Sequence, residues 1–158
     1  MTEHDKINQI LLTVMDPEVP VLTISDLGVL RDVIIADDLI EVVITPTYTG
    51  CPAMDMIEVN IKAALQENGY ESVKVSRVLS PAWTTDWISE EGRQKLLEYG
   101  IAPPQRKGLS SINGEVNIPC PQCASTATEM ISHFGSTACK ALYKCNDCKE
   151  PFDYFKCL

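Results

Sequence analysis

The chain has 158 residues, of which 45% are hydrophobic, so it is long enough to form one domain with a buried core and a small second module. Its formal net charge of -9 argues against nucleic acid or an anionic membrane as a partner, because both attract basic surfaces. No apolar run is as long as a membrane-spanning helix, and the first residues lack the pattern of a signal peptide. We therefore expect a cytoplasmic protein.

The first part of the chain predicts a helix followed by a β-hairpin. Thr2 and Asp5 have the spacing of a capping box, and apolar residues then recur at helical intervals, which predicts a helix over residues 3–15. Two runs rich in β-branched residues, 29–36 and 39–45, are separated by a short polar turn. This pattern is typical of two antiparallel strands.

A β-α-β unit is predicted next, because a second helical pattern runs to Asn68 and a strand pattern with period two covers residues 72–78. The strand over 72–78 should lie parallel to the strand over 39–45. Cys51 stands between the first of these strands and the helix, so it is expected at the carboxyl edge of the sheet. Open α/β sheets commonly bind ligands at that edge.

Cys51 is the candidate functional thiol of this first domain. If Pro52 takes the first helical position, Cys51 occupies the N-cap, where free N–H groups and the helix dipole favour the thiolate. The alternative is a small apolar side chain that fills the corner. Asp16 and Glu18 could reach this region, or they could simply cap and solvate a proline turn. No base, carboxylate pair or phosphate-binding loop has usable spacing, so we expect no catalytic activity from the chain alone.

The domain boundary is predicted after a short helix that Ser89 caps and Gly100 ends. Residues 102–114 are rich in proline, glycine and polar side chains, as linkers are. We therefore expect a first domain over residues 1–101 and a second module over 115–158.

Two C-x-x-C pairs in the second module indicate a metal site. Cys120 and Cys123 are separated from Cys145 and Cys148 by 21 residues, close to the spacing of a zinc ribbon. Four thiolates suit a structural zinc ion, and they could also hold a single iron. A module of this size has too small a core to fold alone, so the metal should supply folding free energy.

Two cysteines lie outside this set of four. Cys139 and Cys157 could be packed thiols, exchangeable ligands, a reversible disulfide, or ligands of a second metal together with Cys51. His133 could replace a cysteine ligand, although four thiols are already present.

Several motifs resemble known families. The segments that resemble the MIP18 (DUF59) family, found in iron–sulfur cluster assembly factors, are Asp16-Pro17-Glu18, Ser25-Asp26-Leu27-Gly28 and the Thr45 to Pro52 stretch. The segments that resemble the D subunits of bacterial phenylacetyl-CoA epoxidases are Pro81 to Ser89, Tyr99 to Pro104, Phe134 to Tyr143 and Glu150 to Cys157.

These resemblances imply an accessory protein of the epoxidase system in phenylacetate catabolism, acting in the assembly, insertion or repair of an iron–sulfur cluster. The implied partners are the epoxidase components, in particular the reductase, and a homodimer by analogy. Cys51 is implied as a ligand for a transient cluster. The alternative is an interaction subunit that does not handle iron. The expected fold is α+β, with a small mixed sheet and helices (hairpin, then β-α-β), followed by a C-terminal zinc ribbon.

Overall fold

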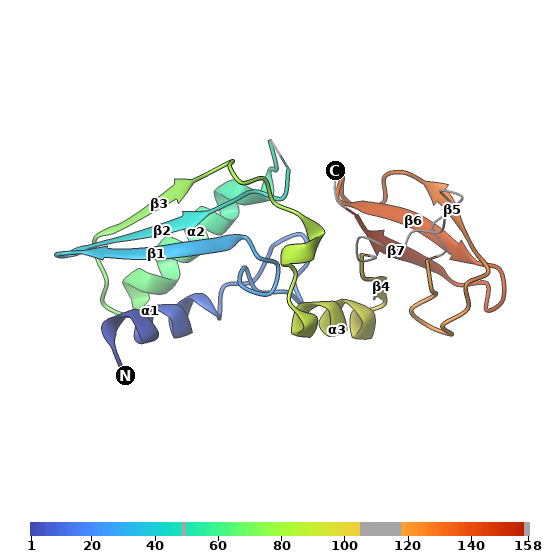
Figure 1. Ribbon diagram of the computed structural model, residues 1–158, viewed down its shortest axis with the longest axis horizontal. Helices are drawn as coiled ribbons and strands as arrows, with labels where there is room; N and C mark the ends of the chain where they lie inside the picture. The colour runs from blue at the N-terminus through green and yellow to red at the C-terminus, as the bar shows by residue number, and fades with distance from the viewer. Residues whose placement is uncertain (49, 105–117, 157–158) are drawn as a thin grey trace. The chain divides into compact units, whose positions relative to one another are not determined.

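The chain folds into two compact units, Met1–Trp83 and Thr84–Leu158, each with its own β-sheet (Figure 1). The structure, a computed structural model, describes residues 1–48, 50–104 and 118–156. Within these ranges none of the helices has both the length and the apolar character that a bilayer-crossing segment requires. The architecture is the expected α+β fold with a small mixed sheet, followed by a β-rich C-terminal unit.

The first unit has a three-stranded sheet with the order β1-β2-β3. The strands are β1 (Leu30–Ala36), β2 (Leu39–Ile44) and β3 (Val73–Arg77). β1 pairs antiparallel with β2, and β3 pairs parallel with β2, as the sequence predicts. A parallel pair needs a long crossover connection, which is the segment that contains α2. β2 therefore ends at the same edge of the sheet as β3.

Two helices, α1 (Glu3–Leu11) and α2 (Ala53–Glu67), cover one face of this sheet. They contact each other, and α1 also contacts β1 while α2 contacts β3 (Figure 1). The side chains buried in α2 recur at helical spacing, as do Ile7 and Leu11 in α1. The Thr2–Asp5 capping box is present, but α1 ends four residues before the predicted position. Thr13 donates its hydroxyl to the Ile10 carbonyl at 2.6 Å as the chain leaves the helix.

The second unit begins with a short helical segment and ends in a four-stranded sheet with the order β4-β7-β6-β5. Its elements are η1 (Thr85–Trp87), α3 (Glu90–Tyr99), β4 (Ile101–Ala102), β5 (Thr128–Ser132), β6 (Lys140–Cys145) and β7 (Pro151–Phe155). The Ser89 side chain caps α3, and Gly100 ends it with a φ of 90°, as predicted. In the C-terminal part of this unit, β5, β6 and β7 form one antiparallel meander.

The boundary between the two units lies earlier in the chain than the sequence analysis places the domain boundary. α3 and β4 group with the second unit, since β4 pairs parallel with β7. A two-residue strand carries no periodicity that the sequence could reveal. Most of the predicted linker, from residue 105 onward, lies outside the described residues.

We predict that Ile61→Ala lowers the free energy of unfolding of the first unit by about 2–5 kcal/mol, because Ile61 is fully buried in α2. The matched control is Val59→Ala on the same helix, which should change it by less than about 0.5 kcal/mol since Val59 is 60% exposed. Amide hydrogen exchange of α2 measures both changes. Equal effects of the two substitutions would contradict this packing.

Candidate functional site

The connection between β2 and α2, called here the β2–α2 corner (residues 45–48 and 50–52), holds the candidate thiol. Thr45 continues the ladder by donating its N–H to the Val29 carbonyl at 2.9 Å. Gly50 then turns the chain with a φ of 81°, where other residues are strained. Cys51 donates its N–H to the Tyr48 carbonyl at 3.2 Å, and α2 begins two residues later. The thiol therefore lies at the carboxyl edge of the parallel pair, as predicted.

Cys51 does not occupy the N-cap, which was the predicted position. Pro52 is the N-cap residue, and Ala53 is the first helical residue. Since Pro52 has no N–H, the first N–H group of the helix available to the thiol belongs to Ala53, and it donates to the Cys51 sulfur. The helix therefore starts one residue later than the sequence predicts.

The environment of the Cys51 thiol favours its protonated form, which corrects the expectation of a favoured thiolate. Burial raises the pKa of the thiol above its usual value, and the carboxylate of Glu18 raises it further. Hydrogen bonds from the Ala53 N–H and from the side chains of Thr47 and Tyr48 act in the opposite direction but do not compensate. Only 9% of Cys51 is exposed, so desolvation outweighs the attraction of the helix terminus. Binding of a metal would displace the proton.

The two acidic residues of the proline turn have different positions. Asp16 is buried and accepts the N–H groups of Glu18 and Val19, each at 2.8 Å, so it caps the turn. Glu18 lies close enough to Cys51 to raise the pKa of the thiol. The structure thus brings Glu18 to the thiol and assigns Asp16 to the local turn.

Two features of this region were not predicted from the sequence. The Thr45 hydroxyl is buried and has no hydrogen-bond partner among the described residues. Arg77, at the end of β3, contacts Asp55 at 2.6 Å and Glu58 at 3.0 Å, which ties the start of α2 to the sheet. Neither feature has a local sequence signal, because both depend on the pairing of distant segments.

We predict slow alkylation of Cys51 by iodoacetamide at pH 8, with a rate that rises more steeply above pH 9 than that of a short unstructured peptide containing the same cysteine. The raised pKa leaves less thiolate at pH 8 in the folded protein, and alkylation requires the thiolate. Mass spectrometry of the Cys51 peptide measures the rate. A rate equal to or faster than that of the reference peptide would contradict the buried, protonated thiol.

The second candidate site is a four-sulfur group made by Cys120, Cys123, Cys145 and Cys148. All four sulfur atoms lie within 4.8 Å of one another. The Sγ atoms of Cys120 and Cys148 are 3.7 Å apart, and those of Cys123 and Cys145 are 3.6 Å apart. Four sulfurs at about 2.3 Å from a tetrahedral metal would be about 3.8 Å from one another. The residues present therefore fit a tetrahedral metal ion.

The two cysteine pairs have the same local geometry. In each, a left-handed residue follows the second cysteine, Ala124 with a φ of 62° in one pair and Lys149 with a φ of 68° in the other. The first pair is closed by Cys120 N–H donating to Ser125 O at 2.8 Å, and the second by Cys145 N–H donating to Glu150 O at 3.0 Å. Each turn thereby directs backbone N–H groups at its own sulfurs, which stabilises thiolates.

The four thiols influence one another strongly. Backbone N–H groups, first that of Cys148, lower the pKa of Cys145 to about 7. Glu150 donates its N–H to Cys148, but burial and the neighbouring sulfurs raise the pKa of Cys148 to about 12. Such crowding of thiols is unfavourable unless a cation neutralises the thiolates.

The remaining candidates in the second unit lie outside the four-sulfur group. Cys139 is buried, with its sulfur 3.0 Å from the Thr137 hydroxyl. His133 is exposed, and Cys157 lies outside the described residues.

We predict that the purified protein carries one metal ion per chain and that replacing any residue of the four-sulfur group with Ser abolishes its binding. The metal should contribute on the order of 10 kcal/mol to folding, so β5 to β7 should lose their amide protection in these variants. Elemental analysis and hydrogen exchange provide the readouts. The matched control, Cys139→Ser, should keep both metal and protection. Folded, protected strands in metal-free protein would contradict this prediction.

Comparisons with known proteins place both units in families. Residues 4–77 match the family described as iron-sulfur cluster assembly protein, and residues 104–156 match the PaaD zinc beta ribbon domain. A protein of Escherichia coli named as the D subunit of 1,2-phenylacetyl-CoA epoxidase is 48% identical over 149 residues, which cover 94% of this chain and 90% of that protein. The chain belongs to this family of epoxidase D subunits.

Two further similarities concern the first part of the chain. A protein of Porphyromonas gingivalis named Fe-S protein maturation auxiliary factor is 37% identical over 102 residues, 63% of this chain and 92% of that protein. The crystal structure of a DUF59 domain from Bacillus anthracis is 28% identical, has a TM-score of 0.55, and covers 59% of this chain and 90% of its own. The resemblances stated from the sequence are thereby confirmed.

Proposed function

We propose that the chain is an accessory protein of the phenylacetyl-CoA epoxidase system that acts in the assembly, insertion or repair of an iron–sulfur cluster. The observation that carries this proposal is the position of Cys51 in a unit of the iron-sulfur assembly family, at the carboxyl edge of the parallel strands β2 and β3. The family relation to the epoxidase D subunits supplies the pathway, aerobic phenylacetate catabolism.

In this proposal Cys51 binds the cluster as cargo. The thiol is sheltered and its protonated form is favoured, so it reacts only slowly with oxidants and alkylating agents before iron arrives. Coordination by iron displaces the proton, and the N–H of Ala53 and the hydroxyls of Thr47 and Tyr48 then stabilise the thiolate. A ligand that returns easily to its protonated form releases its cargo easily.

The chain has too few remaining thiols to supply all the ligands of an iron–sulfur cluster. The four-sulfur group uses four of the seven cysteines, which leaves Cys51, Cys139 and Cys157. An iron–sulfur cluster normally takes four protein ligands. A cluster on Cys51 therefore needs further ligands from a second copy of the chain, from a small thiol or from the client. Each route gives an exposed, labile cluster, as transfer requires.

The four-sulfur group holds zinc in this proposal, and its role is structural. Four protein thiolates leave no open position for substrate, which is the pattern of structural zinc sites. Zinc does not change its redox state, so the second unit keeps its fold while iron is handled elsewhere. Elemental analysis distinguishes zinc from a single iron in the same site.

We predict that Cys51→Ala leaves the fold intact but abolishes support of growth on phenylacetate, because truncating one small side chain removes little packing while it removes the thiol. Far-ultraviolet circular dichroism measures the fold, and complementation of a deletion strain measures function. The matched control is Cys139→Ala, another buried thiol, which should complement. Full complementation by Cys51→Ala would identify Cys51 as a packing residue.

A second candidate function, an interaction subunit of the epoxidase that does not handle iron, is favoured by the name of the Escherichia coli relative. The two candidate functions predict different iron contents for the reductase in a strain that lacks this chain. The assembly role predicts reductase that is deficient in iron, whereas the interaction role predicts a full complement.

A further inference from the structure

Helix α2 presents apolar side chains to solvent as well as to the core. Its core side holds Ile57, Ile61 and Leu65, which are buried. Val59 lies two residues from both Ile57 and Ile61, about 200° around the helix, and is 60% exposed. The exposed apolar residues on this side form a row that we call the outer stripe: Pro52, Met56, Val59 and Ala63. A surface helix normally carries polar residues there, so an exposed apolar row marks an interaction site.

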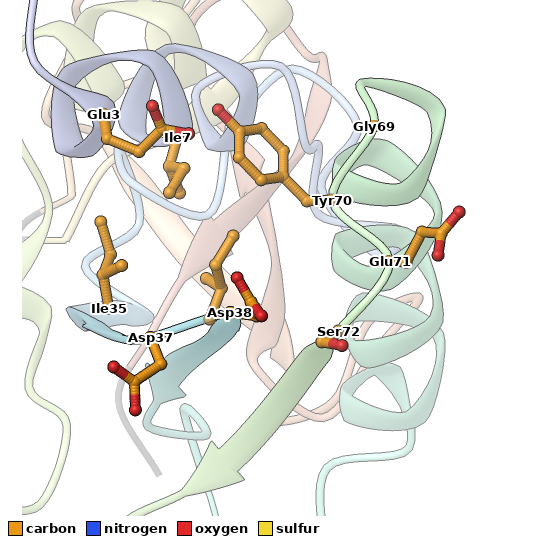
Figure 2. Close-up of a pocket in the computed structure, with 10 residues that line it drawn as sticks. Glu3, Ile7, Ile35, Asp37, Asp38, Gly69, Tyr70, Glu71 and Ser72 are labelled. Carbon is orange, nitrogen blue, oxygen red and sulfur yellow. The ribbon is translucent and has the colours of Figure 1, made fainter.

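The spacing of the outer stripe is that of a helix–helix seam. Its members are separated by four, three and four residues, as are the a and d positions of paired helices. The stripe begins at Pro52, the residue after Cys51, so it is continuous with the β2–α2 corner. The opposite end of α2 differs, because the pocket of about 500 Å³ beside Gly69 is lined by carboxylates that include Asp37 and Glu71 (Figure 2). The apolar surface therefore belongs to the thiol end of the helix.

The charges beside the outer stripe complement those of a second copy. In a parallel helix pair, the residue before an a position faces the residue five positions later in the partner. Lys62 then faces the partner's Glu67, and Asp55 faces the partner's Asn60, so no like charges meet. Lys62 contacts Glu58 of its own helix at 3.1 Å, and its ammonium has further N–H groups to donate. The seam is thus complementary to itself.

The position of Cys51 selects the parallel orientation. Since α2 has 15 residues and is about 22 Å long, an antiparallel pair would hold the two thiols at opposite ends of the contact. A parallel pair places both Cys51 residues at the same end. The proposed function leaves a cluster on Cys51 short of protein ligands, and a second Cys51 supplies one of them.

We propose that the outer stripe is the contact between two copies of the chain, with the two α2 helices parallel and both Cys51 residues beside one cluster. This inference rests on the proposed function, because the shared cluster decides the orientation. The stripe has four side chains, fewer than the roughly 20–30 residues a side of a stable interface. The pairing is therefore weak in iron-free protein and becomes tight when both thiols bind the same cluster.

Sedimentation equilibrium of the full-length, zinc-loaded protein at up to about 1 mM tests the contact without iron, and we expect weak dimerization of the wild type. Val59→Lys and Val59→Glu should each weaken it at least about tenfold, because Val59 faces the partner's Val59 and the introduced like charges repel. An equimolar mixture of the two variants should restore dimerization, since opposite charges then meet. In an antiparallel pair Val59 would face the partner's Met56, and the mixture would restore nothing.

The matched control is Leu12→Lys at the end of α1, which adds the same charge at a side chain of similar exposure, 53%, and should dimerize as the wild type does. Circular dichroism should be unchanged in all variants, because both positions are exposed. Three results would overturn the contact: no dimer at about 1 mM, unchanged dimerization in either Val59 variant, or a mixture that fails to restore it.

Iron separates this inference from the proposed function. Reconstitution with iron and sulfide should tighten dimerization of the wild type at least about tenfold and leave that of Cys51→Ala unchanged. If the iron-free tests succeed but iron changes neither protein, the α2 contact stands without its cluster and the iron–sulfur proposal fails. A cluster that requires Cys51 on a monomeric wild type would overturn the contact and leave the iron–sulfur proposal intact.

Discussion

The parallel pairing of β2 with β3 is the constraint on which the first unit depends. Two parallel neighbours cannot be joined by a tight turn, so the chain must cross over through α2. That crossover places the β2–α2 corner at the carboxyl edge of the sheet and brings the start of α2 against the end of β3, where Arg77 contacts Asp55. The position of Cys51 follows from the topology, and its chemistry follows from the burial that the corner imposes.

The two candidate sites use cysteine in opposite ways. Cys51 is a single sheltered thiol whose raised pKa favours the protonated form. The four-sulfur group instead gathers four thiols within 4.8 Å, an arrangement that a metal ion stabilises and that protons alone do not. In the proposed function, one chain thus combines a permanent metal site that supports a fold with a thiol that remains free to exchange ligands.

Several parts of the fold and of the candidate sites could be predicted from the sequence, because their sequence patterns are local. The Thr2 capping box, the hairpin and the two C-x-x-C pairs each depend on residues a few positions apart, and the structure contains each of them. The protonation state of Cys51 could not be predicted in the same way. The Ala53 N–H at the start of α2 does lower the pKa of the thiol, but burial and the charge of Glu18, which both depend on residues distant in sequence, raise it more. The same holds for β4, a strand of two residues that exists only through its pairing with β7.

The central claim is that Cys51 holds an iron–sulfur cluster in transit, and anaerobic reconstitution tests it most directly. The zinc-loaded protein and its Cys51→Ala variant are incubated with iron and sulfide, and the visible absorption of a cluster is recorded before and after addition of the apo-reductase. The account predicts a labile cluster on the wild type that requires Cys51 and that passes to the reductase. Identical spectra for the two proteins, or a cluster that stays on this chain, would contradict it.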